Sequence, residues 1–163
     1  GMERAMKSGF GTYAVQAGHL KVGALVAVNA LGDVYDGAVQ IAGLRNAEGT
    51  GLSNTLEEMF QDVTIAENLF TGNTTLGIIV TNAKLNKTQL TKVAGMTHNG
   101  YARAIRPVHT NADGDSIYAL STGGQAGDVN VVGSMAAWAM ERAIVRAVRA
   151  ARSAYDLPGC GAL

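Results

Sequence analysis

The sequence predicts an α+β or layered α/β fold in a single domain. The chain has 163 residues, a length typical of one domain. Hydrophobic residues make up 47% of it, which is enough to form a buried core. Strand-like segments come first, and a strand–helix–strand–helix series follows a polar stretch in the middle. Sheets and helices in this order pack as layers around one core.

Three strand-like segments occupy the first part of the chain. Residues 11–17 and 20–30 predict two strands, and residues 39–42 predict a short third strand after a turn at 32–37. Apolar side chains occupy both alternating sets of positions in 22–28. A strand of this kind is typically buried on both faces, so we expect both faces of the second strand to be covered.

The segment 44–73 is polar and rich in glycine, and we expect a surface excursion or a mobile loop there. Within it, residues 55–60 predict a short helix, with Asn54 as its N-cap and Glu57 at the third helical position. A loop of this length is uncommon unless it has a function, such as that of a lid or a processing site.

The second half of the chain alternates strands and helices. Residues 75–82 and 116–122 predict strands, and glycines end the second one. Between them, residues 86–105 carry apolar side chains at helical spacing behind a capping asparagine. An alanine-rich helix is predicted over about 129–154, where small side chains allow close packing against the sheet or a partner helix.

Composition and charge argue against several classes of function. Thirteen Lys and Arg balance thirteen Asp and Glu, so the chain lacks the basic surface expected of a nucleic-acid-binding protein. The longest apolar run, 22–31, is too short to span a bilayer. Cys160 is the only cysteine, and the three histidines lack metal-ligand spacing. We therefore expect a cytoplasmic protein without a cofactor, a metal, or a nucleic-acid or membrane partner.

The most informative segment is the polar turn at 72–75, which leads directly into an apolar strand. If the Asn73–Thr74 bond is cut, Thr74 carries both a hydroxyl and a free amine, which are a nucleophile and a base in one residue. The local pattern by itself favours the simpler interpretation that threonine begins a strand, because it is β-branched.

Asn29 and an Asp-Gly-Asp sequence are the other candidate polar features. Asn29 ends a strand predicted to be buried, so its carboxamide needs a hydrogen-bond partner. It either forms the turn before Gly32 or donates to an oxyanion near a neighbouring strand. Asp113 and Asp115 have the spacing of the start of a calcium loop, but the further ligands of such a loop are missing, which favours a plain turn.

Three blocks of the sequence together resemble a known family. They are residues 9–33, residues 73–105 beginning with NTTLGIIVTNA, and residues 113–123 with the sequence DGDSIYALSTG. In these blocks the chain is similar to the L-aminopeptidase/D-esterase and β-peptidyl aminopeptidase family, whose members are self-cleaving hydrolases related in fold to ornithine acetyltransferase. The resemblance covers nearly the whole chain except the variable loop at 44–72.

The resemblance implies a four-layer αββα sandwich and a precursor that cuts itself before a Ser or a Thr. By motif match the N-terminal nucleophile is Thr74, and Asn73 is the last residue of the first chain. The family's oxyanion-stabilising asparagine matches Asn29. Its Ser-x-acid pair falls on Asp113 and Asp115, with Asp in place of Ser at the first position.

Members of this family carry a long segment before the first block. We therefore expect the chain to be the C-terminal portion of such a sandwich, without the N-terminal strands and pocket walls. A partial fold exposes sheet edges and apolar surface, which favours association into a homo-oligomer.

The leading hypothesis is a self-processing aminopeptidase, amidase or esterase that cleaves N-terminal residues from short peptides, amides or esters. Two alternatives stay open. One is a catalytically inactive fragment that keeps the family's core and forms an oligomeric module through its alanine-rich helix. The other is an acyltransferase that uses the same threonine but passes the acyl group to an amine.

Overall fold

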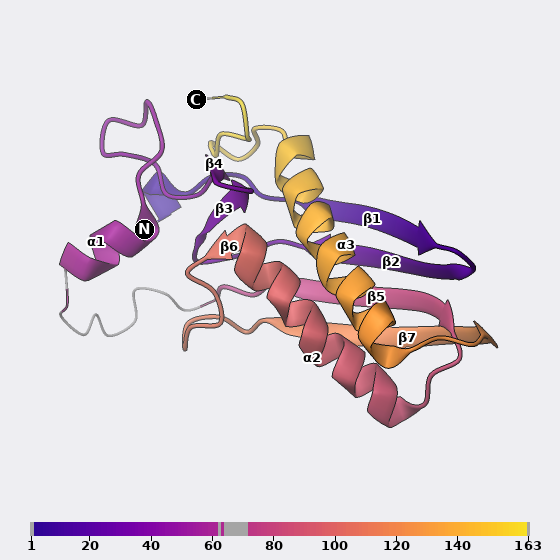
Figure 1. Ribbon diagram of the computed structural model, residues 1–163. Helices are drawn as coiled ribbons and strands as arrows, with labels where there is room; N and C mark the ends of the chain where they lie inside the picture. The colour runs from indigo at the N-terminus through magenta and orange to yellow at the C-terminus, as the bar shows by residue number, and fades with distance from the viewer. Residues whose placement is uncertain (1, 62, 64–71, 163) are drawn as a thin grey trace.

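The computed structural model describes residues 2–61, 63 and 72–162. These residues form a four-stranded sheet with two long helices on one face, and a smaller three-stranded sheet beside it (Figure 1). The described residues thus have an α+β fold. No helix within the described ranges is long and apolar enough to cross a membrane.

Four strands form the larger sheet, in the spatial order β1 (Phe10–Ala17), β2 (Leu20–Ala27), β5 (Leu76–Ala83) and β7 (Ser116–Gln125). The pairs β1–β2 and β2–β5 are antiparallel, whereas β5 and β7 are parallel. A parallel pair needs a crossover connection, and α2 (Lys87–Ala104) supplies it. Leu76 pairs with Ser116, so β5 and β7 begin side by side at one end of the sheet.

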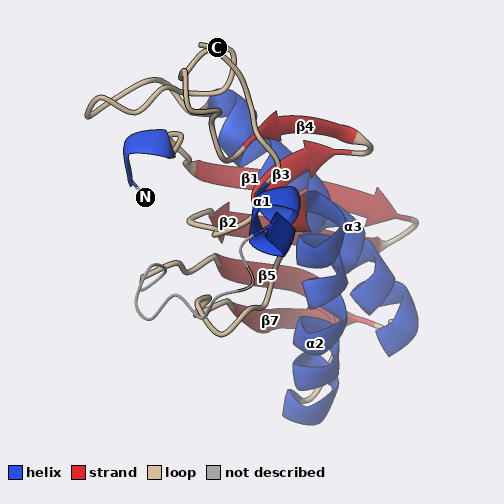
Figure 2. Ribbon diagram, turned by 90° about the vertical axis from the view of Figure 1, so that its left-hand side faces the viewer, coloured by secondary structure: helices blue, strands red, loops and turns tan. Residues whose placement is uncertain are grey.

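Two helices cover one face of this sheet (Figure 2). They are α2, which begins with a capping box at Asn86, and α3 (Val129–Ala150), which is capped by Asp128. A Cβ on Gly100 would lie 2.4 Å from the carbonyl oxygen of Ala137, so a side chain there would push the helices apart. The close packing predicted for the alanine-rich helix is confirmed.

The alanine-rich helix ends at Ala150, earlier than the predicted 154. The chain turns back at this point, because Ala154 and Leu157 form an isolated bridge. Gly159 then packs against the carbonyl of Ala151, where a Cβ would approach its oxygen to 2.4 Å. Contacts of the returning tail, rather than helix propensity, set the end of α3.

The smaller sheet has the strand order β4 (Val39–Ala42), β3 (Asp33–Asp36) and β6 (Ile105–Arg106). The predicted turn at 32–37 is therefore wrong, because residues 33–36 form the central strand of this sheet. Asp33 is fully buried, and its carboxylate accepts hydrogen bonds from the Leu44 N–H at 2.9 Å and from the Thr55 N–H and hydroxyl at 2.8 and 2.7 Å. These bonds fix the start of β3 to the segment after β4.

The segment predicted to be a surface loop contains α1 (Thr55–Gln61), which confirms the short helix expected there. Glu58 of this helix pairs with Arg4 at 2.6 Å, so the described part of the segment is attached to the N-terminal residues. The expected mobility concerns in large part residues 62 and 64–71, which lie outside the described residues.

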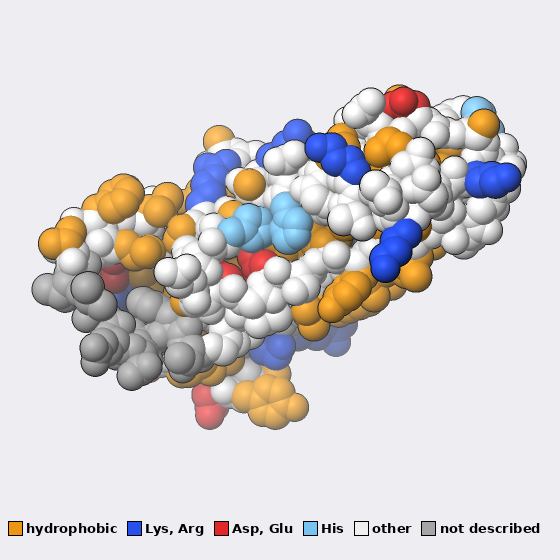
Figure 3. Space-filling model, turned by 90° about the horizontal axis from the view of Figure 1, so that it is seen from below, with side chains coloured by type: hydrophobic (Ala, Val, Ile, Leu, Met, Phe, Trp, Pro, Cys, Tyr) orange, Lys and Arg blue, Asp and Glu red, His pale blue; other side chains and the backbone are white. Residues whose placement is uncertain are grey.

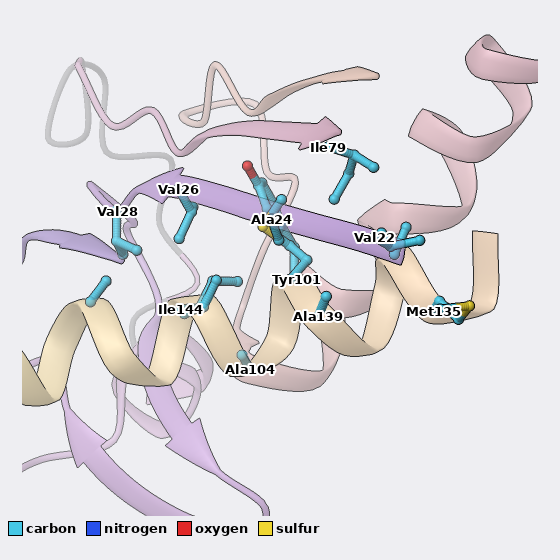
Figure 4. Close-up of a cluster of buried hydrophobic side chains, with 14 of the residues drawn as sticks. Val22, Ala24, Val26, Val28, Ile79, Tyr101, Ala104, Met135, Ala139 and Ile144 are labelled. Carbon is cyan, nitrogen blue, oxygen red and sulfur yellow. The ribbon is translucent and has the colours of Figure 1, made fainter. Parts of the chain in front are cut away.

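The core lies between the larger sheet and its two helices (Figure 4). β2 contributes Val22, Ala24 and Val26, β5 contributes Ile79, and α2 contributes Tyr101; each is at most 1% exposed. Burial of these side chains supplies the main favourable term for folding. It also fixes α2 and α3 relative to the ends of the strands that carry the candidate site.

The opposite face of the larger sheet has no covering layer among the described residues. Its exposed apolar side chains, called the open sheet face below, are Phe10, Leu76, Ile78, Tyr118 and Leu120. β2 is accordingly buried on alternate residues only, and the prediction that both of its faces are covered is wrong for this chain. Its second set of apolar residues faces the same side as the open sheet face.

Replacing Asp33 by alanine should lower the free energy of unfolding by about 3 kcal/mol, because the Leu44 and Thr55 donors would lose their charged acceptor. Asp36→Ala is the matched control. The Asp36 carboxylate pairs with the exposed Arg149, and loss of such a pair costs about 1 kcal/mol or less. Urea denaturation measures both values. Equal losses would show that Asp33 does not anchor this segment.

Candidate active site

The Asn73–Thr74 bond lies where β2 ends and β5 begins. The Thr74 N–H donates to the Asn29 carbonyl at 2.7 Å, which ties it to the end of β2. On the other side, Asn73 forms a parallel bridge with Asp113, and the Gly114 N–H donates to the Asn73 carbonyl at 2.9 Å. The bond is thus held between two neighbouring chain segments that continue the sheet beyond its strands.

The Thr74 hydroxyl lies against the carbonyl of the bond that precedes it. Its Oγ1 is 2.7 Å from the Asn73 carbonyl oxygen and donates a hydrogen bond to it. The same oxygen accepts the Gly114 N–H, a backbone donor suited to stabilise negative charge there. A Cβ at Gly114 would lie 2.7 Å from Thr74 Oγ1, so glycine leaves the room that the hydroxyl occupies.

Asn29 is close to this bond but does not contact its carbonyl. The Asn29 Nδ2 donates to the Gly72 carbonyl oxygen at 3.0 Å, one residue before Asn73. Among the described residues, the Thr74 hydroxyl and the Gly114 N–H donate to the Asn73 carbonyl oxygen. The amide nitrogen of Asn29 carries two hydrogens, so its second N–H is available for another acceptor.

The two carboxylates of the Asp-Gly-Asp sequence have different partners. Asp113 accepts from the Leu31 N–H at 3.4 Å through Oδ1, and from the Thr110 N–H and hydroxyl at 3.1 and 2.7 Å through Oδ2. It therefore connects the loop after β2 to the turn before β7. Asp115 accepts the Thr75 N–H at 2.9 Å through Oδ1. Both carboxylates thus hold the backbone around the Asn73–Thr74 bond.

The three histidines lack metal-ligand spacing in the sequence, which assigns them no role. In the structure the ring centroids of His98 and His109 are 4.7 Å apart, and His109 Nδ1 is 2.9 Å from Asp115 Oδ2. Figure 3 shows histidine side chains at the surface beside acidic ones. Because His98 lies on α2 and His109 after β6, only the fold brings the two together.

Tyr101 is a second residue that the sequence reasoning assigned only to the core. Its phenol donates to the Thr75 carbonyl at 3.2 Å and lies 3.4 Å from the Ser116 carbonyl oxygen, so it contacts the starts of both β5 and β7. Burial, and secondarily the Asp115 carboxylate, raises the pKa of Tyr101 and keeps the phenol protonated. His98 lies one turn earlier on α2, a spacing that puts both residues on one face.

A cavity of about 360 Å³ opens beside the bond. Its lining combines the N-terminal segment, the end of β2 and the loop after it, the β3–β4 region, α3, the C-terminal tail and the Asn73 side of the bond. Lining residues include Met6, Lys7, Asn29, Leu31 and Asn73. The described residues contain no group of three or more His, Cys, Asp or Glu able to hold a metal ion.

The model of peptidase family S58 matches residues 1–159. The chain belongs to peptidase family S58. It is 32% identical over 176 residues to an uncharacterised aminopeptidase of Mycobacterium leprae, covering 96% of this chain and 48% of the relative. It is 30% identical over 128 residues to a 6-aminohexanoate-oligomer endohydrolase of Kocuria sp., covering 74% of this chain and 35% of that relative. The family resemblance inferred from the three sequence blocks is confirmed.

Two solved structures resemble the fold. One is an L-aminopeptidase D-Ala-esterase/amidase from Ochrobactrum anthropi, described as a variant of the Ntn-hydrolase fold, with a TM-score of 0.64 at 20% identity over 98% of this chain and 46% of that one. The other is a Burkholderia sp. β-aminopeptidase, with a TM-score of 0.54 and 25% identity. The match covers 89% of this chain and 42% of that one. The S58 chain thus has the expected α+β, Ntn-hydrolase-like fold in part, and it spans about half the length of the curated aminopeptidases it matches.

Proposed function

We propose that this S58 chain carries the nucleophile of a self-processing aminopeptidase or amidase-esterase, which cleaves N-terminal residues from short peptides, amides or esters. Thr74 is the nucleophile, and breaking of the Asn73–Thr74 bond releases it. The observation that carries the proposal is the position of the Thr74 hydroxyl, 2.7 Å from the Asn73 carbonyl oxygen, with the Gly114 N–H on the same oxygen.

Self-cleavage follows from this geometry in two steps. A rotation about the Thr74 Cα–Cβ bond turns an oxygen lone pair toward the Asn73 carbonyl carbon, and the Gly114 N–H stabilises the negative charge that develops on the carbonyl oxygen. The C–N bond then breaks. The Thr74 nitrogen takes up the hydroxyl proton, and an ester joins Asn73 to Oγ1. Water hydrolyses this ester and leaves a free carboxylate on Asn73 and a free Thr74 hydroxyl.

The released Thr74 then acts on substrate. Its amine accepts the hydroxyl proton while Oγ1 attacks the substrate carbonyl, and the acyl group is later transferred to water. The second N–H of the Asn29 amide donates to the substrate oxyanion, and Asp113 and Asp115 keep the surrounding backbone in place. The names of the Ochrobactrum and Burkholderia structures, an aminopeptidase-esterase/amidase and a β-aminopeptidase, support this class of substrate.

A cytoplasmic homo-oligomer is part of the same proposal. The open sheet face consists of large apolar side chains that are 38–65% exposed, and surfaces of this kind are normally covered by another layer or another subunit. Two observations are compatible with the cytoplasm. The charge of the chain is balanced, and its described part contains no membrane-spanning helix.

The first test is the intact mass of the complete gene product under denaturing conditions. We expect two fragments that divide between Asn73 and Thr74, hydrolysis of aminoacyl p-nitroanilides, and little hydrolysis of the same substrates after N-acetylation. Thr74→Ala should give one uncut, inactive chain, and Thr74→Ser should restore both cleavage and hydrolysis.

Other outcomes point to the alternatives. An uncut, inactive wild-type protein would favour the oligomeric module, and transfer to added amines faster than hydrolysis would favour an acyltransferase. Equal hydrolysis of N-acetylated substrates would favour an endo-acting amide hydrolase, the activity named for the Kocuria relative.

Gly114→Ala should slow self-cleavage by about 100-fold, because a Cβ 2.7 Å from Thr74 Oγ1 displaces the hydroxyl by a distance of order 1 Å. Gly95→Ala is the control, since a Cβ at that position on α2 meets no atom within 4 Å. The rate of fragment formation after expression at low temperature measures the effect. Similar rates in both variants would contradict the assigned position of the nucleophile.

Asn29→Ala should separate the two reactions. Hydrolysis by the cleaved protein should fall by about 100- to 1000-fold, because a donor to the substrate oxyanion is lost. Self-cleavage should fall much less, because Asn29 donates to the Gly72 carbonyl and not to the Asn73 carbonyl in the uncut chain. Asn130→Ala, at an exposed position of α3, is the control. An equally large loss of self-cleavage would show that Asn29 acts on the Asn73 carbonyl after all.

A further inference from the structure

A line of polar side chains connects the surface with the backbone next to the nucleophile. The Asp115 side chain is 3% exposed, and its Oδ1 accepts the Thr75 N–H at 2.9 Å. His109 Nδ1 lies 2.9 Å from Oδ2, which is an ion-pair distance, and this buried oxygen accepts no hydrogen bond from the described residues. His109 Nε2 lies 3.2 Å from His98 Nδ1. The His109 side chain is 35% exposed, and Figure 3 shows histidine side chains, in pale blue, at the surface.

The position of His109 is fixed by its neighbours. Its backbone has φ 59°, a conformation that few non-glycine residues adopt. The ring lies on Tyr101 at a centroid distance of 5.8 Å in a stacked arrangement, and His98 meets it edge-on. Packing against two rings of α2 therefore holds the imidazole over Asp115, in spite of the unfavourable backbone conformation.

Only one proton can lie between the two histidines in this arrangement. His109 Nδ1 faces a carboxylate and therefore best carries a proton. His109 Nε2 and His98 Nδ1 then share a single proton between them. If both rings are charged, two N–H donors face each other at 3.2 Å. The pair thus accepts one additional proton without a change in its arrangement. A second additional proton makes the two N–H donors repel and separates the rings.

The other groups that face the pair are few. Tyr101 is the titratable group that α2 adds, and Asp115 comes from the turn before β7. Burial and then His109 lower the pKa of His98, whereas Asp115 raises it. His98 therefore takes up a proton below the ordinary histidine value of about 6.5.

We propose that His98 and His109 are a pair of positioning residues that passes one proton between solvent and the side of Asp115, and so controls how firmly Asp115 holds the Thr75 amide next to the nucleophile. A proton binds to His98 Nε2 from solvent, and the proton on His98 Nδ1 moves to His109 Nε2. His98 is then neutral again, and His109 carries the positive charge beside the carboxylate. The reverse sequence returns the proton to solvent.

The consequence for function rests on the proposed self-cleavage. While the pair is intact, Asp115 keeps both of its partners and the Thr74–Thr75 segment stays aligned. When a second proton separates the rings, His109 loses one of the two rings that hold it over Asp115, and the acceptor of the Thr75 amide is held less firmly. Self-cleavage should therefore slow on the acid side, with a midpoint below about 6.5.

The structural arm of the test does not need cleavage. In the uncut Thr74→Ala form of the complete gene product, with ¹⁵N-threonine and ¹³C-histidine labels, the Thr75 amide shift should change with pH together with the His98 and His109 ring signals. His109→Asn should abolish this change: asparagine tolerates positive φ and retains a donor for Asp115, but it cannot titrate. His19→Asn, at an exposed histidine bonded to the Ala126 carbonyl, should leave it unaltered.

A Thr75 amide that does not respond between pH 5 and 8, or that responds equally in His109→Asn, overturns the proposal whether or not the chain cleaves itself. If His109→Asn does not fold, His98→Gln gives the same decision. With glutamine at position 98 no second charge faces His109, so the pH response of the Thr75 amide should again be lost. A response equal to that of the wild type would overturn the proposal.

The kinetic arm compares self-cleavage rates between pH 5 and 8. The wild type and His19→Asn should both slow on the acid side by at least tenfold. His109→Asn should keep a rate within about threefold of wild type at pH 8 and show no acid decline in this range. A purely structural role of His109 predicts instead an equal loss at every pH. If the wild type does not cleave at all, the proposed function fails, and the amide titration still decides the role of the pair.

Discussion

The parallel pairing of β5 with β7 is the constraint on which the candidate site depends. The ladder of these strands continues beyond their ends through a bridge between Asn73 and Asp113. This one register sets the Asn73 carbonyl against the Gly114 N–H and the Thr75 N–H against Asp115. A slip by one residue would exchange all of these partners and reverse the face of every side chain.

The crossover required by a parallel pair also supplies the rest of the site. α2 leaves the far end of β5 and returns toward the end where both strands begin, so its last turns lie beside the Thr74–Thr75 segment (Figure 1). That return brings Tyr101 and His98 to the start of β5. The helices and the site are therefore not separate features, because the packing that forms the core also positions the polar groups.

Several features could be predicted from the residues, and their reasons are local. The main strands and helices follow from apolar periodicity and from caps such as Asn86, and the short helix at 55–60 follows from its own capping residues. The errors have non-local causes. Residues 33–36 have the composition of a turn, but the bonds of buried Asp33 to Leu44 and Thr55 make them a strand. The end of α3 likewise depends on the tail that packs behind it.

The sequence alone determined that the chain folds as α+β, that it belongs with a peptidase family, and that Thr74 follows a turn where a nucleophile could be released. These are properties of local pattern and of matching blocks. Only the tertiary structure decided which groups contact that bond. It put Gly114 rather than Asn29 on the Asn73 carbonyl, and it joined His98 to His109, because hydrogen-bond partners far apart in a chain are chosen by strand register and helix packing.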